Sequence, residues 1–269
     1  MAAHLELLGD HPHVAVVTID RPAQANSLDP STLRELAAAW RRVAADPEIR
    51  CAVLTGAGDR VFCAGMDMKT TIPAAQRFAR GERVDDATFE GLRDVSTALL
   101  AGFDLGRPLV CAINGHARAG GFDLMLASEL RFAVPHATFA LEEVALGLYP
   151  TGNATVLLPR QIPWVHAHEL LLTARPITAQ RALEIGLINR IVAPHDLMAT
   201  ALGAADAIAG NAPLAVGATR RGVRELLHLS LEEAYERQEE IGRPLRRSED
   251  AREAQRAFVE KRRPIWQGK

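Results

Sequence analysis

Two carboxylates and a glycine turn mark residues 107–152 as the segment best equipped for chemistry. Asp123 follows the turn Gly120-Gly121, and Glu143 comes 20 residues later. A glycine turn that leads into a helix leaves main-chain N–H groups free to bind an anion. Carboxylates beside such donors can move protons while the donors stabilise negative charge on a carbonyl oxygen. We therefore expect these groups to converge on one site of acid–base chemistry.

Three local elements are expected to position these groups. Residues 109–113 form an apolar run that ends at Asn-Gly, which predicts a buried strand and a turn. Residues 137–141 form a second compact strand-like run just before Glu143. Between the two runs, apolar residues recur at helical spacing: Phe122, Met125, Leu126 and Leu130. The sequence thus predicts a strand, a glycine turn and a helix that carries Asp123.

The N-terminal part of the chain shows the same alternation of strands and helices. Residues 14–19 and 50–55 are β-branched or apolar runs that predict buried strands, and residues 61–65 predict a shorter one. A helix is predicted over residues 29–43, with an aspartate as N-cap and proline at the first helical position. This order of elements predicts an α/β fold built from right-handed units.

Residues 69–93 look different from their surroundings. They are polar and irregular, and they carry charges of both signs. A segment of this kind is usually a surface loop, and this one is long enough to cover a ligand. We therefore expect a loop or lid here.

The C-terminal part of the chain changes from mixed to helical patterns. The elements before the change are two helices and a strand, predicted over residues 165–173, 178–186 and 187–192. Beyond them the spacing is helical throughout, and Ser248 is the expected cap of the last helix. We therefore divide the chain into a core that holds the ligand site, residues 1–195, and a C-terminal helical region, residues 196–269.

Composition limits the class of protein. Lysine plus arginine total 31 against 33 acidic residues in a chain of 269, so we expect no general affinity for nucleic acid or membranes. No apolar run approaches the roughly 18 residues that a spanning helix needs, and a secretory signal pattern is absent, which favours a cytoplasmic location. The cysteines show no CxxC spacing and are expected to be buried thiols: Cys51, Cys63 and Cys111.

Several motifs together resemble the crotonase superfamily, also called the enoyl-CoA hydratase/isomerase family. They follow the family's order over nearly the whole chain: RPAQANSLD, LTGAGDRVFCAGMD, RPLVCAINGHARAGGFDLMLASELRFA, FALEEVALGLYPTG, LLLTARPITAQRALEIGLINRIV and AFVEKRRPIW. The resemblance implies a crotonase-like spiral of ββα units with a helical C-terminal trimerisation region, assembled as a homotrimer or a dimer of trimers. It also implies an acyl-CoA thioester substrate, with coenzyme A part of that substrate and no metal or redox cofactor.

The resemblance assigns four site residues. The oxyanion-hole donors are the backbone N–H groups of Met66, in the AGxD motif, and of Gly120, in a GGG turn whose first glycine is here Ala119. The two glutamates of the hydratases correspond to Asp123 and Glu143, so the first acid is one methylene shorter. Such donors hold the charge of an enolate oxygen, and losing one typically costs about 3–4 kcal/mol of barrier. The carboxylates would supply and remove protons.

Contacts to the coenzyme are implied at three further positions. Lys69 matches a place where the family often has a basic residue near the nucleotide. Phe258 and Lys261 match places where the C-terminal helix, often of a neighbouring subunit, covers adenine and meets phosphate. His116 also lies near the glycine turn, but that place is variable in the family, so no catalytic role is assigned to it.

Departures from the family pattern leave three functions open. Asp123 with Glu143 also resembles the dienoyl-CoA isomerases of the superfamily, but the position of their third acid is Thr151 here, and the hydratase stretch PGAGG is PTGNA. The leading hypothesis is a hydro-lyase that adds water to a 2-enoyl-CoA through an oxyanion hole and two carboxylates. The alternatives are an enoyl-CoA or dienoyl-CoA double-bond isomerase, which needs little more than Glu143, and a non-catalytic acyl-CoA binding protein.

Overall fold

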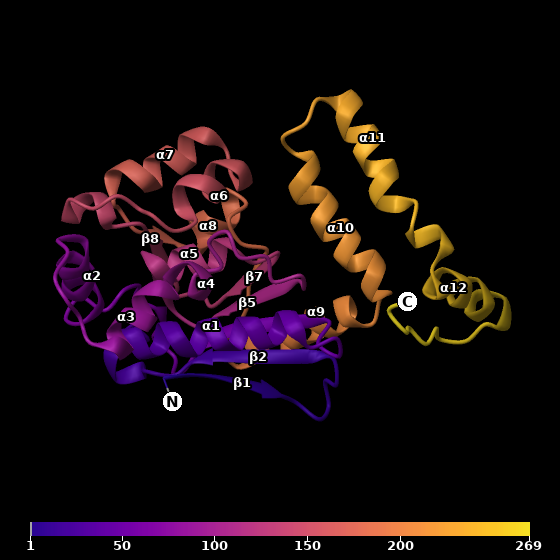
Figure 1. The fold of residues 1–269 in the computed structure, drawn as a ribbon, viewed down its shortest axis with the longest axis horizontal. Helices are drawn as coiled ribbons and strands as arrows, with labels where there is room; N and C mark the ends of the chain where they lie inside the picture. Colours follow the sequence, from indigo (N-terminus) through magenta and orange to yellow (C-terminus); the bar gives the residue numbers. More distant parts are fainter. Residues whose placement is uncertain (1) are drawn as a thin grey trace.

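The computed structural model describes residues 2–269 and contains two β-sheets that share one hydrophobic core (Figure 1). In the first sheet β1 runs antiparallel to β2 and the other neighbours are parallel. Its strands, in spatial order, are β1 (Ala3–Leu7), β2 (Val14–Ile19), β3 (Cys51–Gly56), β5 (Leu109–Ile113), β7 (Leu130–Ala133) and β10 (Arg190–Ile191). The second sheet consists of β4 (Val61–Cys63), β6 (His116–Arg118), β8 (Thr138–Ala140) and β9 (Ile177–Thr178).

Successive turns of the chain contribute one strand to each sheet and then one or more helices. β3 is followed by β4, β5 by β6, and β7 by β8, and helices follow each of these pairs. Strands β3 and β5 are buried along their whole length, as expected for parallel strands covered on both faces. The predicted α/β spiral of ββα units is therefore confirmed.

Local sequence signals explain most of the helices around the two sheets. Asp29 begins α1 by accepting a hydrogen bond from the Thr32 N–H at 2.8 Å, and Thr178 caps α8 in the same way. The helices of this part are α1 (Pro30–Ala45), α4 (Val95–Ala98), α5 (Gly120–Leu126), α6 (Ala154–Gln161), α7 (Trp164–Thr173), α8 (Ala179–Glu184) and α9 (Leu197–Ala209). Short 3₁₀ turns are η1 (Pro22–Gln24), η2 (Glu143–Leu146), η3 (Pro194–Asp196) and η4 (Leu245–Arg247).

The prediction of a loop over residues 69–93 was wrong. This segment forms two helices, α2 (Thr71–Ala79) and α3 (Asp86–Arg93), which together make a hairpin (Figure 1). Asp85 caps α3 by accepting from the Thr88 N–H, and the rings of Phe78 and Phe89 pack between the helices with centroids 5.5 Å apart. Each helix is so short that its few apolar residues, set among charged ones, do not show a clear helical spacing in the sequence.

Two predicted boundaries also shift. Leu130 begins β7 rather than continuing the helix of Asp123, and the last predicted strand shortens to β10. Helix α5 ends at Leu126 because the buried guanidinium of Arg131 binds carbonyl oxygens that would otherwise continue it. Its acceptors include the carbonyls of Met125 at 2.7 Å, Leu126 at 3.1 Å and Ser128 at 2.9 Å.

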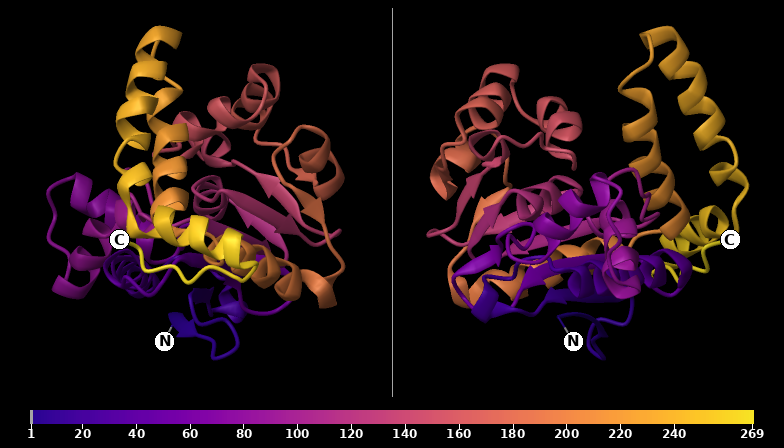
Figure 2. Two further views of the ribbon diagram at one scale, coloured as in Figure 1. Left: turned by 90° about the vertical axis from the view of Figure 1, so that its right-hand side faces the viewer. Right: turned by 60° about the vertical axis from the view of Figure 1, so that its left-hand side comes forward.

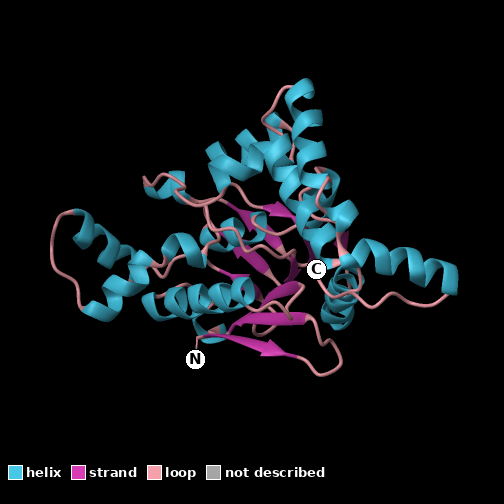
Figure 3. Cartoon of the chain, turned by 45° about the vertical axis from the view of Figure 1, so that its right-hand side comes forward, coloured by secondary structure: helices cyan, strands magenta, loops and turns pink. Residues whose placement is uncertain are grey.

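Three C-terminal helices form an arm that stands beside the two-sheet body (Figures 1 and 2). They are α10 (Pro213–Leu226), α11 (Leu231–Gly242) and α12 (Glu249–Glu260), the last capped by Ser248 as predicted. Helix α9 packs on the first sheet through buried Leu197, Ala201 and Ala205. The helices that stand apart begin after Gly210, whereas the predicted C-terminal helical region, residues 196–269, also includes α9. Figure 3 shows the arm as an almost purely helical addition.

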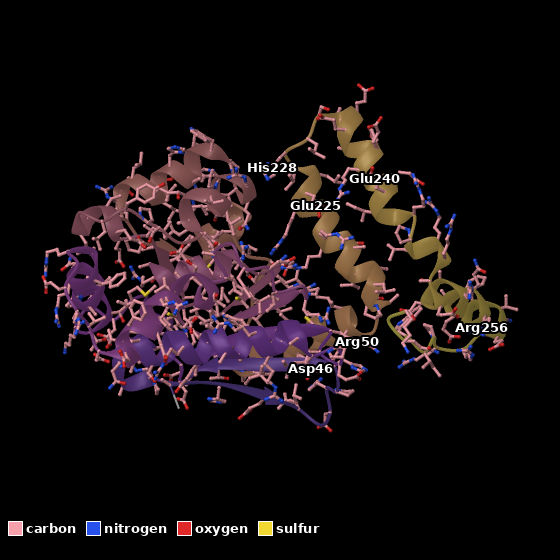
Figure 4. The ribbon with its side chains drawn as sticks, viewed as in Figure 1. Asp46, Arg50, Glu225, His228, Glu240 and Arg256 are labelled. Atoms are coloured by element: carbon pink, nitrogen blue, oxygen red, sulfur yellow. The ribbon has the colours of Figure 1, made fainter. Side chains whose placement is uncertain are left out.

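Ion pairs and main-chain contacts fix the arm. In Figure 4, Arg50 lies at the junction, and its guanidinium donates to the carbonyl oxygens of Ala209 at 3.4 Å and Trp266 at 3.2 Å. Glu225 of α10 accepts a bond from Arg237 of α11 at 2.9 Å. The three cysteines are buried, as predicted. Within residues 2–269, no helix is both long and apolar enough to cross a membrane.

Candidate active site

Glu143 lies at the first position of η2, directly after β8. Its side-chain Oε2 is buried, yet nothing in residues 2–269 gives this atom a hydrogen bond. Burial raises the pKa of Glu143; its own main-chain N–H lowers this pKa, and the charge of Glu142 raises it. An acid with a buried, unpartnered oxygen favours its protonated form and keeps an unused site for a hydrogen bond.

The neighbouring Glu142 has a different role. Its carboxylate accepts a bond from the Arg118 guanidinium at 2.8 Å, which neutralises its charge. Arg118 also donates to the hydroxyl of Thr138 at 3.0 Å, and that hydroxyl contacts a ring nitrogen of His116 at 2.9 Å. The structure therefore separates the adjacent glutamates: Glu142 is part of a surface network with His116, whereas Glu143 is not.

Asp123 lies in the first turn of α5, and its side chain is almost completely buried at 3% exposure. Its Oδ1 accepts hydrogen bonds from the N–H groups of Asn153 at 2.6 Å and Ala154 at 2.7 Å, where α6 begins. A β-carbon at Gly152 would lie 2.3 Å from Oδ2, so any larger residue there would require this carboxyl to move. Asp123 is thus clamped against the N-terminus of α6.

The two acids interact electrostatically. Burial, and then the nearby charge of Glu143, raise the pKa of Asp123 to about 7, against the opposing effect of the two main-chain bonds. Both acids therefore have raised pKa values, and each disfavours ionisation of the other. A carboxyl with a raised pKa gives or takes a proton near neutral pH more readily than a free carboxyl does. One group can then act as an acid while the other acts as a base.

The two proposed main-chain donors lie on adjacent segments. The Gly65 carbonyl accepts from the Leu28 N–H at 2.8 Å, and the Asp67 N–H donates to the Leu28 carbonyl at 3.0 Å. In this arrangement the intervening Met66 N–H points away from Leu28. Within residues 2–269, neither that group nor the Gly120 N–H donates a hydrogen bond.

Glycine at position 65 permits the close approach of these segments. A β-carbon at Gly65, where φ is +85°, would lie 2.9 Å from the Gly120 nitrogen. The carboxylate of Asp67 secures the same loop, because its Oδ1 accepts from the Lys69 N–H at 2.9 Å and its Oδ2 from the Ser27 hydroxyl at 3.1 Å. Sequence reasoning used the AGxD motif for its N–H group and missed this role of its aspartate.

Ala119 has an uncommon backbone conformation. Its φ is +44° and its ψ is −118°, which glycine adopts readily and alanine does not. The replacement of the first glycine of the turn is therefore more than a mild departure. The strain lies immediately before Gly120, which fits the general tendency of strained residues to occur at functional sites.

The residues expected to contact coenzyme A do not meet within the chain. Lys69 is exposed just before α2, and Phe258 and Lys261 are exposed at the end of α12. Helix α2 belongs to the body, and α12 lies in the part of the arm that is far from it (Figure 1). One chain by itself therefore does not bring Lys69 close to the other two residues.

A large cavity lies away from the acids. It has a volume of about 1180 Å³ and lies between the body and α10, with Leu157, Val223 and Leu227 among its lining residues. Asn153 borders it, but Asp123 and Glu143 do not. This cavity therefore does not mark the position of the two carboxyls.

The ββα spiral with its helical arm defines a protein of the crotonase type. The family follows from comparison with known sequences. The chain belongs to the enoyl-CoA hydratase/isomerase family, whose model matches residues 10–269. It is an enzyme of that family, with acyl-CoA chemistry, as the motifs predicted.

Individual relatives agree with this assignment over their full lengths. The chain is 42% identical over 257 residues to the enoyl-CoA hydratase EchA19 of Mycobacterium tuberculosis, which covers 96% of this chain and 94% of the relative. It is 40% identical over 261 residues to a carnitinyl-CoA dehydratase of Proteus mirabilis, covering 95% of each. A crystal structure of an enoyl-CoA hydratase from Bacillus anthracis matches with a TM-score of 0.88 at 31% identity, covering 100% of both chains.

Proposed function

We propose that the protein adds water to the C=C bond of a 2-enoyl-CoA thioester. The observation that carries the proposal is the buried Oε2 of Glu143, which lacks a partner in residues 2–269 although it lies in the electrostatic range of Asp123. A buried oxygen of this kind is suited to hold the proton that a substrate carbon receives. The family and the named relatives support the same reaction class.

The two acids divide the work in this proposal. Asp123 acts as the base: the two N–H bonds favour its ionised form and partly offset burial, so that at and above a pH of about 7 it can take a proton from water. The water oxygen then bonds to the β-carbon, and the C=C electrons move towards the thioester carbonyl. Glu143 gives its proton to the α-carbon, which completes the addition, and the proton left on Asp123 returns to Glu143 through solvent.

Negative charge collects on the thioester oxygen during this addition. The N–H groups of Met66 and Gly120 are free to bind it, and they are fixed before the reaction begins. Preorganised donors stabilise such charge without a reorganisation cost, and each is worth about 3–4 kcal/mol of barrier. The thioester itself is the electron sink, so the proposed reaction does not require a metal.

We also propose that binding of the coenzyme needs a second copy of the chain. Lys69 would contact the nucleotide on one copy, while Phe258 and Lys261 on α12 of a neighbouring copy would cover it. The separation of α12 from α2 within one chain supports this arrangement (Figure 1). It corresponds to the homotrimer or dimer of trimers that the family resemblance implies.

The test uses crotonyl-CoA and matched variants. Hydration removes the absorbance of the conjugated thioester and adds the mass of one water to the product. Glu143→Gln removes the proton donor while keeping the shape, so kcat/KM should fall by about 10²–10⁴-fold. Glu142→Gln is the control, because Glu142 already pairs with Arg118, and it should stay within about threefold of the wild type. Equal losses in both variants would contradict the assignment of Glu143.

One observation favours a double-bond isomerase as a second candidate. Oδ1 of Asp123 is already occupied by two N–H groups, whereas Glu143 has a free oxygen and could shuttle one proton alone. An isomerase would convert a 3-enoyl-CoA to its 2-enoyl isomer without any change in mass. Product masses from both substrates would therefore distinguish the two reactions.

A further inference from the structure

Asn153 joins three parts of the molecule at the beginning of α6. Its main-chain N–H donates to Asp123 Oδ1 at 2.6 Å. Its side-chain Nδ2 donates to the carbonyl oxygen of Asp123 at 3.0 Å and to that of Leu99, just after α4, at 2.8 Å. The residue is buried, at 4% exposure. Asn153 therefore holds both the carboxyl and the backbone of Asp123.

The hydratase stretch that this segment resembles offers no counterpart to this bridge. In the hydratase stretch PGAGG, glycine stands where this chain has Asn153, and glycine has no side chain to make these bonds. This chain also has the shorter acid at position 123. Because the shorter side chain reaches less far, the backbone that carries it and the helix end that receives it must lie closer together.

The geometry around the carboxyl leaves little tolerance for movement. Both N–H contacts of Asp123 Oδ1 are 2.7 Å or shorter, and Gly152 packs so closely that a β-carbon would overlap the carboxyl group. The Nδ2 bridge fixes the distance between α5 and α6 on this side. Displacements of about 1 Å in a catalytic group can lower rates by about 10²-fold.

We propose that Asn153 is a positioning residue, whose side-chain amide ties α5 to α4 and α6 and so fixes the carboxyl of Asp123. It does not touch the substrate itself. The inference rests on the proposed function, because it concerns the placement of the proposed base. It predicts an effect on turnover rather than on binding of the thioester.

The test compares Asn153→Ala and Asn153→Ser with a buried asparagine elsewhere. Asn114 is the matched control, because its side chain also binds main-chain groups. Its Nδ2 donates to the carbonyls of Gly58 at 2.8 Å and Val61 at 3.5 Å, and its Oδ1 accepts from the Gly56 N–H at 3.1 Å. Asn153→Ser keeps a hydroxyl and perturbs the fold least. Measurements are kcat and KM on an enoyl-CoA, thermal unfolding, and crystal structures of the variants.

We expect kcat of Asn153→Ala to fall by about 10–100-fold, with KM changed less than about twofold. Asn153→Ser should retain more of the rate, and Asn114→Ala should lower the unfolding temperature while keeping kcat within about twofold. In the Asn153 variants the carboxyl of Asp123 should move off the Ala154 N–H.

Two outcomes separate this inference from the proposed function. If the wild type hydrates an enoyl-CoA and Asn153→Ala retains its kcat, or the Asp123 carboxyl does not move, the positioning role is wrong and the function stands. If the wild type adds water to no enoyl-CoA, the proposed function fails and the inference fails with it.

Discussion

The two acids of the site have contrasting surroundings, although both have a raised pKa. Asp123 lies on a regular helix and receives two main-chain N–H bonds on one oxygen. Glu143 lies on a single 3₁₀ turn, and its buried Oε2 has no partner in residues 2–269. One acid thus has one oxygen held by the main chain, whereas the other has a buried oxygen that is available to a group outside the chain. The unused capacity marks where substrate chemistry is expected.

The largest expected effect comes from removing the charge of the engaged acid. Asp123→Asn should reduce kcat/KM by about 10²–10⁴-fold, because the amide cannot accept a proton from water. The same change should stabilise the fold at pH 8. An Asp123 pKa of about 7, raised from 3.8, means that the unfolded chain loses the proton at lower pH than the native state. Native stability therefore falls as pH rises from about 4 to about 7.

The amide removes this penalty. At pH 8 the gain should be of order 4 kcal/mol at most, since each unit of pKa shift corresponds to about 1.4 kcal/mol. At pH 4 the variant and the wild type should be nearly equal, because Asp123 is protonated in the native state. Urea unfolding at both pH values measures the difference. A variant that is less stable than the wild type at pH 8 would show that the two N–H bonds need the charged form.

A smaller loss is expected from crowding the fixed acid without altering its chemistry. In Gly152→Ala the new β-carbon would lie 2.3 Å from Asp123 Oδ2, so the carboxyl must shift. We expect kcat to fall by about 10²-fold. Gly203→Ala is the control, because Gly203 lies in α9 with nothing within 4 Å of its β-carbon position, and it should keep full activity. Similar kinetics for both variants would contradict the close packing of Asp123.

The pH dependence tests the assignment of base and acid. Asp123 must be ionised to take a proton from water, so kcat/KM should rise, by about tenfold per unit, as pH approaches about 7 from below. Any fall at higher pH belongs to the proton donor Glu143, and Glu142→Gln should move that fall to lower pH, because the charge of Glu142 helps to raise the pKa of Glu143. Rates from pH 6 to 9 at constant ionic strength measure both effects. A kcat/KM that does not change with pH would contradict the assignment of these two acids to proton transfer.

The smallest effect concerns the strained turn that precedes Gly120. Ala119→Gly should raise the free energy of unfolding by about 1 kcal/mol, because relief of strain exceeds the entropy cost of glycine. Ala174→Gly is the control, since Ala174 has a milder left-handed conformation with φ of 55° and ψ of 15°. Its gain should be smaller. Unfolding in urea measures both variants, and equal gains would show that Ala119 carries no special strain.

The fold was largely predictable because its signals are local and strong. The apolar strands β2, β3 and β5 and the caps of α1 and α12 agree with their predictions. The hairpin of α2 and α3 was not predicted, because its helices depend on packing such as the contact of Phe78 with Phe89. Such contacts leave only a weak pattern in the sequence.

The site was predictable in its identities but not in its supporting contacts. The spacing of motifs located Asp123 and Glu143, and their roles as catalytic residues remain predictions. The sequence did not show that Asn153 bridges to Leu99 or that Arg131 ends α5, because both contacts join residues far apart in the chain or depend on burial. A polar residue in a stretch of small residues is the available signal for Asn153.

Arg131 holds the C-terminal end of α5, whereas Gly120 and Asp123 lie at the N-terminal end. The helix has only seven residues, and the buried guanidinium donates hydrogen bonds to carbonyl groups at its C-terminal end. A helix of this length cannot absorb a displacement by bending. Movement at its C-terminal end would therefore also move Gly120 and Asp123 at its N-terminal end. Arg131 thus supports the site from the far end of α5 without being part of it, and loss of its hydrogen bonds should lower turnover.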